Sequence, residues 1–216
     1  NKILKQYLID KGIPESDIFV NYTPFGHSDW SKIVSDVVSL GADGKKVGVI
    51  STINGDANIG FYKELAAAGV KADDIPVVAF SVGEEELSGL DTKNLVGHLA
   101  AWNYFQSAES DLNSKFISSW KSKMGNKRVT NDPMEAHVIG FEMYVKAVEK
   151  AGSTNVDAVR KAMYGLKVPN LTGGIAEMLP NHHLSKPVLI GEILENGQFD
   201  IISQTKEVPG DAWTDH

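Results

Sequence analysis

Cysteine is absent from this chain of 216 residues, and that absence excludes several kinds of chemistry. Without thiols there are no disulfide bridges, no thiolate nucleophile, and no zinc or iron–sulfur centre held by cysteine. Long apolar runs are missing as well, because no stretch approaches the roughly 18 residues that a membrane-spanning helix needs. The sequence therefore predicts no membrane span.

Positive charge is also scarce. The chain carries 21 lysines and arginines against 28 aspartates and glutamates, which gives a net charge of -7 and an isoelectric point near 5.4. Binding to nucleic acids and to anionic membranes depends on clustered cations. We therefore expect neither a nucleic acid nor a membrane surface among the partners.

Catalytic and cofactor-binding motifs are lacking too. The sequence has no GxSxG elbow for a serine nucleophile, and no GxGxxG or Walker loop for nucleotide phosphates. The adjacent His182 and His183 are candidate metal ligands, but neighbouring side chains usually point apart and no HExxH helix accompanies them. The pattern indicates no enzyme, no cofactor and no metal; a metal-dependent hydrolase would need these histidines and a carboxylate to assemble a site.

The chain begins NKILKQYL, without an initiator methionine, a basic region or the apolar core of a signal peptide. Its length fits one large domain or two small ones. We expect a fragment, with any signal peptide outside this numbering.

The first half of the chain alternates β-forming runs with helical patterns. Strands are predicted over 18–22, 46–51 and 75–81, and helices over 2–12, 28–41, 59–69 and 83–90. Strands that alternate with helices in this way are typical of a parallel sheet covered on both faces.

From residue 95 onward the pattern becomes mainly helical. Asp132 is the expected cap of the clearest helix, and the predicted helices cover 110–125, 132–152 and 155–165. Residues 186–203 then predict two strands joined by a two-residue turn at Asn196 and Gly197. A βα half, a helical half and a closing hairpin indicate two lobes that exchange chain segments.

Polar residues gather where two predicted strands end. The loops STINGDAN and SVGEEE contribute, in order, Thr52, Asn54, Gly55, Asp56, Ser81 and Glu84. Ligands of open parallel sheets bind outside the carboxyl ends of the strands. The sequence therefore predicts a cup of hydrogen-bond donors and acceptors at this edge.

Each of these features also has a plainer explanation. Asn, Gly and Asp are common in surface turns, and glutamates at a helix start stabilise it by about 0.5 kcal/mol each through the helix dipole. Trp102 and Tyr104 lie between the two halves and are candidates to line a cleft, because a polar aromatic offers a flat wall and one hydrogen bond. Simple packing of both rings in the core is an equal alternative.

Several stretches together resemble one family of receptors. They are YTPFGHSDWSKIVSDV, VISTINGDAN, IPVVAFSVGEEEL, GHLAAWNYF, RVTNDPMEAHVIGF and VPNLTGGIAEMLPNHHLSKPVLIGEI. Over essentially its whole length the chain is similar to the urea-binding receptors of bacterial urea ABC transporters, a group within the branched-chain amino acid and short-chain amide receptors. The resemblance implies an α/β fold of the type I periplasmic-binding-protein kind, in which two parallel-sheet lobes joined by hinge crossings close over a small ligand.

The resemblance also implies how the chain is divided. Residues 1–95 would form a second α/β lobe, 96–108 a hinge crossing, 109–167 helices of the first lobe, and 168–216 a return crossing, the closing hairpin and the tail of the second lobe. The ligand contacts carried over from the family are Thr52, Asn54, Gly55, Asp56, Ser81, Val82, Glu84, Trp102 and Tyr104.

Such receptors carry a further N-terminal portion that builds the first-lobe sheet, and this sequence does not include it. We therefore expect the chain alone to bind urea weakly or not at all, and helices 110–165 to pack on something else or on another copy. The expected function is capture of urea or a short-chain amide in the periplasm, or otherwise outside the cytoplasm, and its delivery to the permease subunits of an ABC transporter.

Urea suits the polar loops, because it is neutral and planar and presents one carbonyl acceptor and several N–H donors. Acceptors for the amines are expected from Asp56, Glu84 and Asn54, and donors to the oxygen from Tyr104, Thr52 or Ser81. Two other functions stay open. One is a cytoplasmic amide sensor of the same fold, and the other is a receptor for a branched-chain amino acid, which needs apolar room that small polar loops do not offer.

Overall fold

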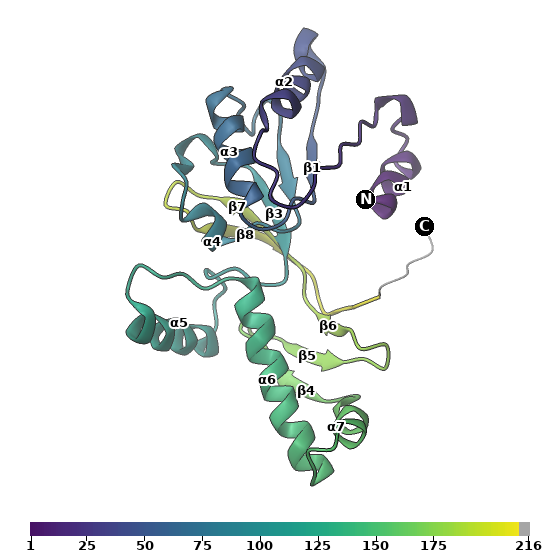
Figure 1. The fold of residues 1–216 in the computed structure, drawn as a ribbon, viewed down its shortest axis with the longest axis vertical. Coiled ribbons are helices and arrows are strands. Elements are labelled where there is room, and N and C mark those ends of the chain that lie inside the picture. Colours follow the sequence, from purple (N-terminus) through teal and green to yellow (C-terminus); the bar gives the residue numbers. More distant parts are fainter. Residues whose placement is uncertain (212–216) are drawn as a thin grey trace.

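The computed structural model describes residues 1–211 and places two β-sheets one beyond the other along an elongated molecule (Figure 1). The larger sheet has the strand order β1-β2-β3-β7-β8. Its strands are β1 (Val49–Ser51), β2 (Val77–Ala79), β3 (Leu99–Trp102), β7 (Leu189–Ile193) and β8 (Phe199–Gln204). Strands β1, β2 and β3 run parallel, and β7 and β8 add an antiparallel hairpin. The predicted α/β class with a parallel sheet is confirmed.

The larger sheet is covered by helices that precede or follow its strands. These are α2 (Ser31–Leu40), α3 (Ala57–Ala67) and α4 (Glu84–Leu87); the short turn η2 (Ala42–Gly44) comes after α2 and the short turn η3 (Thr92–Asn94) after α4. Tyr62 and Leu65 of α3 are fully buried, and they pack in one core with Val34 of α2 and Phe199 of β8. This burial of α3 fixes the loop that precedes it against the sheet.

The smaller sheet is antiparallel, with the strand order β4-β5-β6-β9, and the sequence analysis did not predict it. Its strands are β4 (Lys167–Pro169), β5 (Ile175–Met178), β6 (Leu184–Lys186) and β9 (Val208–Pro209). Three of them hold only two or three residues, too few for an alternating pattern to identify.

The predicted helical half is confirmed. It consists of α5 (Asp111–Met124), α6 (Asp132–Ala151) and α7 (Val156–Met163). Helix α6 packs Ile139 and Met143 on Val168 of β4 and Ala176 of β5, which forms a second and smaller core. Of the helices in the described part of the chain, none is both long enough and apolar enough to cross a membrane.

The N-terminal segment is the least packed part of the described chain. Helix α1 (Lys2–Asp10) has no buried residue and stands apart from the sheets (Figure 1). After the short turn η1 (Glu15–Asp17), residues 18–22 form no strand, so that prediction was wrong. Phe19 and Tyr22 are 63% and 78% exposed. Strand-forming residues adopt a strand only where a neighbouring strand pairs with them, and no strand within residues 1–211 does so here.

Two local details also differ from expectation. The cap of α6 is Asn131, whose Oδ1 accepts a hydrogen bond from Met134 N at 3.2 Å, and not Asp132, whose carboxylate is drawn to another segment. The β7–β8 hairpin is confirmed, but its turn is longer than two residues, because Leu194 N still bonds Gln198 O at 2.9 Å and only Gly197 has a positive φ. Asn196 keeps a negative φ and bonds Gln198 N with its side chain instead.

Candidate functional site

Two loops leave the larger sheet side by side. Strands β1 and β2 are parallel, and their last residues, Ser51 and Ala79, are register partners. The backbone N–H of Phe80 also donates to Ser51 O at 3.0 Å. The first loop (residues 52–56) and the second loop (residues 80–83) therefore start at the same edge, as the sequence predicts for parallel strands.

Asn58 joins the two loops. It lies in the first turn of α3 and is fully buried. Its Nδ2 donates to the carbonyl oxygens of Ile53 at 3.0 Å, Gly55 at 3.2 Å and Ser81 at 3.1 Å. The sequence analysis did not single out Asn58, the last residue of STINGDAN; its helical spacing from Phe61, Tyr62 and Leu65 on the apolar side of α3 is the signal that could have marked it.

The first loop is open to solvent. Thr52, Asn54, Gly55 and Asp56 are all exposed. Thr52 Oγ1 donates to Asn1 Oδ1 at 2.9 Å. Gly55 has a φ of +63°, and no atom lies within 4 Å of where a Cβ would be. Because left-handed backbone is costly for residues with a Cβ, glycine fits this turn. These four side chains and the backbone around them are accessible to a small molecule.

The second loop is more enclosed. Ser81 is half-buried, and Val82 is fully buried in the larger core. Gly83 N donates to Glu86 Oε2 at 2.9 Å, which caps α4, and a Cβ at Gly83 would come within 3.2 Å of the Trp102 ring. Trp102 is half-buried and therefore lies beside this loop, as a wall residue would.

Glu84 is buried rather than open to solvent. Only 1% of its surface is exposed; Oε1 accepts from Gln106 N at 2.6 Å, and Oε2 has no partner within residues 1–211. Burial raises the pKa of Glu84 to about 8, and the charges of Glu86 and Asp132 act in the same direction. A buried carboxyl disfavours ionisation because its charge loses hydration. Burial therefore favours the protonated form of Glu84.

Tyr104 lies in the junction between the two sheets, not in either loop. It is fully buried, and its hydroxyl bonds Asn113 Oδ1 and Thr130 Oγ1, both at 2.7 Å. Burial raises the pKa of this hydroxyl. The structure thus brings Trp102 next to the second loop and places Tyr104 with α5 and the start of α6.

Gln106 makes hydrogen bonds to several segments of that junction, and the sequence analysis did not single it out. Its backbone N–H bonds Glu84, and its backbone oxygen accepts from Asn113 Nδ2 at 3.0 Å. Its side-chain oxygen accepts from Thr130 N at 2.8 Å, and its side-chain nitrogen donates to Gln198 at 2.9 Å. One residue therefore ties α4 and the closing hairpin to α5 and the segment before α6.

Charged groups complete the junction. Asp132 Oδ2 accepts from Asn103 N at 2.9 Å, and burial raises the pKa of Asp132 to about 6 against the opposing charge of Lys186. Glu135 is fully buried and pairs with Lys186 of β6; burial raises its pKa, and Lys186 lowers it. In this junction the acidic side chains outnumber the cation Lys186, so the protonated forms of the carboxyl groups are favoured.

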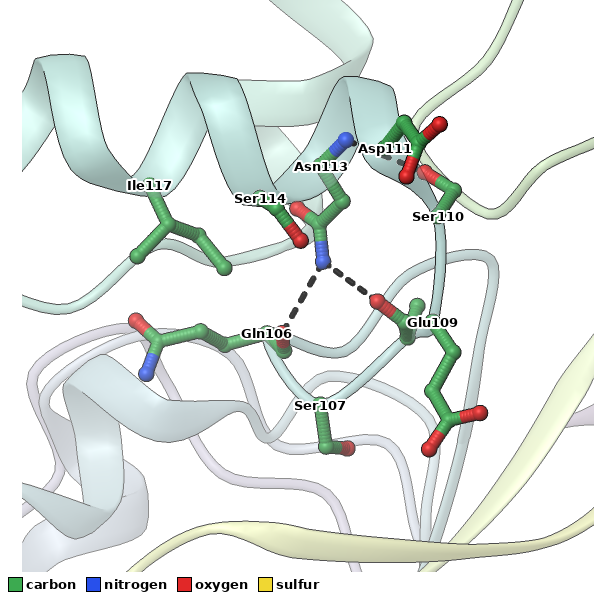
Figure 2. A pocket seen from close by; sticks show the side chains of 9 residues that line it. Gln106, Ser107, Glu109, Ser110, Asp111, Asn113, Ser114 and Ile117 are labelled. Carbon is green, nitrogen blue, oxygen red and sulfur yellow. Dashed lines mark hydrogen bonds between the residues drawn. The ribbon is translucent and has the colours of Figure 1, made fainter.

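Two hollows lie near the predicted loops, and one of them includes the predicted residue Glu84. One, of about 540 Å³, is lined by residues 106–111 with Asn113, Ser114 and Ile117. Figure 2 shows the Asn113 side chain reaching from α5 to the backbone oxygens of Gln106 and Ala108, so this amide closes the loop beneath the helix. A second cavity, of about 400 Å³, lies between α4 and the β7–β8 turn and includes Glu84.

Histidines do not gather into a metal-like cluster within residues 1–211, where no group of three or more His, Cys, Asp or Glu side chains has ligand geometry. His182 and His183 are exposed in the β5–β6 turn, and His182 Nε2 hydrogen-bonds the Tyr164 hydroxyl at 2.8 Å. His98 is buried and accepts from Val77 N at 3.1 Å, a packing role.

Comparison with known proteins adds relatives of differing length. The chain is 30% identical over 118 residues to limonene hydroxylase of Geobacillus stearothermophilus, covering 55% of this chain and 22% of that protein. It is 24% identical over 195 residues to Leu/Ile/Val-binding protein homolog 6 of Brucella melitensis, covering 87% of this chain and 49% of that one. The chain therefore spans half or less of the curated relatives it matches.

Among solved structures, the amino acid ABC transporter substrate-binding protein of Pseudomonas fluorescens Pf-5 superposes with a TM-score of 0.76 at 19% identity, over 95% of this chain and 55% of that one. This likeness shows the type I periplasmic-binding-protein fold. All 216 residues match one family, described as the periplasmic binding protein domain. The chain belongs to that family.

Proposed function

We propose that this chain supplies ligand-holding loops of an extracytoplasmic solute-binding receptor, which passes a small polar solute to the permease of an ABC transporter. The observation that carries the proposal is the pair of polar loops at one sheet edge, braced by Asn58 and flanked by Trp102. Family membership supports binding and delivery rather than catalysis.

The proposed solute is urea or a short-chain amide. The exposed first loop offers the polar side chains of Thr52, Asn54 and Asp56, which suit a neutral planar molecule with one carbonyl and several N–H groups, while Ile53 packs against the core. Ser81, the backbone of Val82 and Trp102 would form the adjoining wall. Glu84 and Tyr104 already bond within the junction, so their direct contact with a solute requires the junction to open.

A branched-chain amino acid receptor is the second candidate. Similarity to the Brucella Leu/Ile/Val-binding protein homolog favours it, and the Pseudomonas structure is of an amino acid receptor. Such a ligand needs an apolar wall for its side chain, and in this chain the large apolar groups at the second loop are Trp102 beside it and Phe80 within it, which is 40% exposed. A cytoplasmic amide sensor of the same fold is a third function, distinguished by its location in the cell.

We also propose the division of the chain given by the family. Residues 1–95 with the hairpin of 168–216 form one lobe, 96–108 cross between lobes, and 109–167 belong to the other. In this arrangement the opposite wall of the cleft comes from outside these 216 residues. The chain alone then binds its solute weakly. Helices 110–165 then pack on a segment outside these 216 residues or on a second copy of the chain.

Ligand-induced thermal stabilisation tests the function. A solute that binds only the folded state raises the melting temperature by mass action. Urea, acetamide, formamide and leucine are compared on this chain and on the longest natural protein that contains it. Stabilisation of the longer protein by urea or an amide at low concentration is expected, with a much weaker effect on this chain. If none of the four solutes stabilises either protein, the proposed function is refuted. Stabilisation by leucine alone would select the second candidate. Micromolar urea binding by this chain would refute the proposal that the opposite wall of the cleft comes from outside these 216 residues.

A further inference from the structure

Asn58 does more than fill space between two loops. We infer that it is a positioning residue, which turns the carbonyls of the first loop inward and thereby presents the N–H groups of Asn54 and Asp56 to an oxygen atom of the solute. The positioning role stands on the geometry of the free protein. The assignment of the solute oxygen rests on the proposed function.

The brace is made by a single nitrogen. Asn58 Nδ2 lies within 3.0–3.2 Å of the carbonyl oxygens of Ile53, Gly55 and Ser81, which belong to both loops. Asn58 N also donates to Gly55 O at 3.0 Å. With the residue fully buried, no water competes for these bonds. The separation of the two loops is therefore fixed by the reach of one amide group.

The orientation of that amide is determined by its partners. Three carbonyl oxygens surround Nδ2, so the opposite orientation would direct Oδ1 at three other acceptors. Oδ1 itself is buried and has no hydrogen-bond partner among the described residues. Leaving an acceptor buried and unpaired is costly.

The peptide planes transmit the effect to the exposed side of the loop. In a trans peptide, the N–H of one residue points opposite to the C=O of the residue before it, and the described chain has no cis peptide. Because the oxygens of Ile53 and Gly55 face Asn58, the N–H groups of Asn54 and Asp56 face away from it. Both residues are exposed, and neither N–H has an acceptor among the hydrogen bonds of residues 1–211.

Two free N–H groups on one face of a loop recognise lone pairs. They fit a carbonyl or carboxylate oxygen and offer nothing to a molecule that carries only donors. Urea and guanidinium are therefore a matched pair of probes, since both are small and planar with amino groups and only urea has an oxygen.

Amide hydrogen exchange measured by NMR, residue by residue in the free chain, tests the brace. Asn58→Ala should speed exchange by about tenfold at Ile59, whose N–H donates to Asp56 O of the first loop, and at Phe80 in the second loop, because the bonds that hold both loops loosen together. Asn58→Asp keeps the shape but replaces the donor with an acceptor, and should loosen both loops at least as much. Lys63→Ala, on the exposed side of α3, is the control and should change neither.

The outcomes separate the inference from the proposed function. Unchanged exchange in Asn58→Ala, or loosening of one loop alone, would overturn the brace. Slow exchange at Asn54 and Asp56 in the unliganded wild-type chain would overturn the claim that these two N–H groups are free. Shifts of these two amide signals with urea and not with guanidinium support the oxygen assignment, and equal shifts overturn it. If neither probe shifts these signals while the brace is confirmed, the oxygen assignment fails and the result counts against the proposed function. The positioning role of Asn58 then still stands.

Discussion

The regions around the two sheets of this molecule differ in how many apolar side chains they bury. Around the larger sheet, helices and strands share one extensive core that includes Trp30, Tyr62 and Phe199. Around the smaller sheet, the apolar cluster is smaller, with Ile139, Met143, Val168 and Ala176 as its buried members. Since burial of apolar area is the main source of stability, the larger-sheet region is expected to be the more stable of the two.

Helix α6 shows the difference most clearly. Its buried side faces the smaller sheet, while Phe141 is 71% exposed and Tyr144 and Val145 are exposed beside it. A helix with apolar residues on opposite sides is typical of one covered on both. Because its apolar core is small, the smaller-sheet region depends on polar contacts at the junction. Each of the following experiments tests this difference between the two regions.

Breaking the buried ion pair should have the largest effect. Lys186→Met leaves Glu135 buried without its cation, which we expect to cost about 3–5 kcal/mol and to act first on the smaller-sheet region. Guanidinium-chloride unfolding measures the loss. The double variant Lys186→Met, Glu135→Gln is the control, since it removes both charges and should recover most of the stability. Equal losses in the single and double variants would contradict this account.

Core truncations compare the regions directly. Leu65→Ala in the larger core should lower the free energy of unfolding by about 3 kcal/mol, and Met143→Ala in the smaller core by about 2 kcal/mol. Hydrogen exchange should show Met143→Ala loosening α6 while α3 stays protected. If α3 and α6 loosen together in both variants, the molecule is one cooperative unit and the comparison fails.

The junction should also make stability depend on pH. Glu84 has an ordinary pKa of 4.5 and a folded value of about 8, so between these values the folded state keeps a proton that the unfolded chain has lost. Unfolding then releases a proton, and stability falls as pH rises, by on the order of 1 kcal/mol per pH unit. Asp132, raised to about 6, contributes in the same direction at lower pH.

Glu84→Gln isolates this effect, because it keeps a neutral side chain of the same shape at every pH. Thermal unfolding followed from pH 5 to pH 9 should show a flatter profile for the variant than for the wild type, with the variant the more stable at pH 9. Parallel profiles for the two proteins would show that Glu84 does not hold its proton.

The exposed side of α6 should matter least to this chain. Phe141→Ser removes a largely exposed ring and should change the free energy of unfolding by less than about 0.5 kcal/mol. Asn131→Ala, which deletes the α6 cap, is the comparison and should cost about 1 kcal/mol. A larger loss in Phe141→Ser than in Asn131→Ala would mean that this face is already covered in solution, and analytical ultracentrifugation would identify a dimer as the cause.

Much of the fold followed from local patterns. The helices α3, α5 and α6, the parallel strands β1 and β2, and the loops between them all appear close to where periodicity and turn residues place them. The errors arose where a distant segment decides. Residues 18–22 have strand-forming side chains without a neighbour to pair with, and Asp132 resembles a helix cap but bonds Asn103, 29 residues earlier in the chain.

The sequence by itself determined the α/β class, the absence of thiol chemistry, and the small polar character of the loop from Thr52 to Asp56. These depend on composition and on neighbours within a few residues. Only the tertiary structure decided that Asn58 braces two loops, that Glu84 is buried with a raised pKa, and that the Tyr104 hydroxyl is used inside the junction. The physical reason is that hydrogen bonds and burial depend on which groups meet in space, and several of the deciding partners, such as Ser81 for Asn58 and Gln106 for Glu84, are more than 20 residues away.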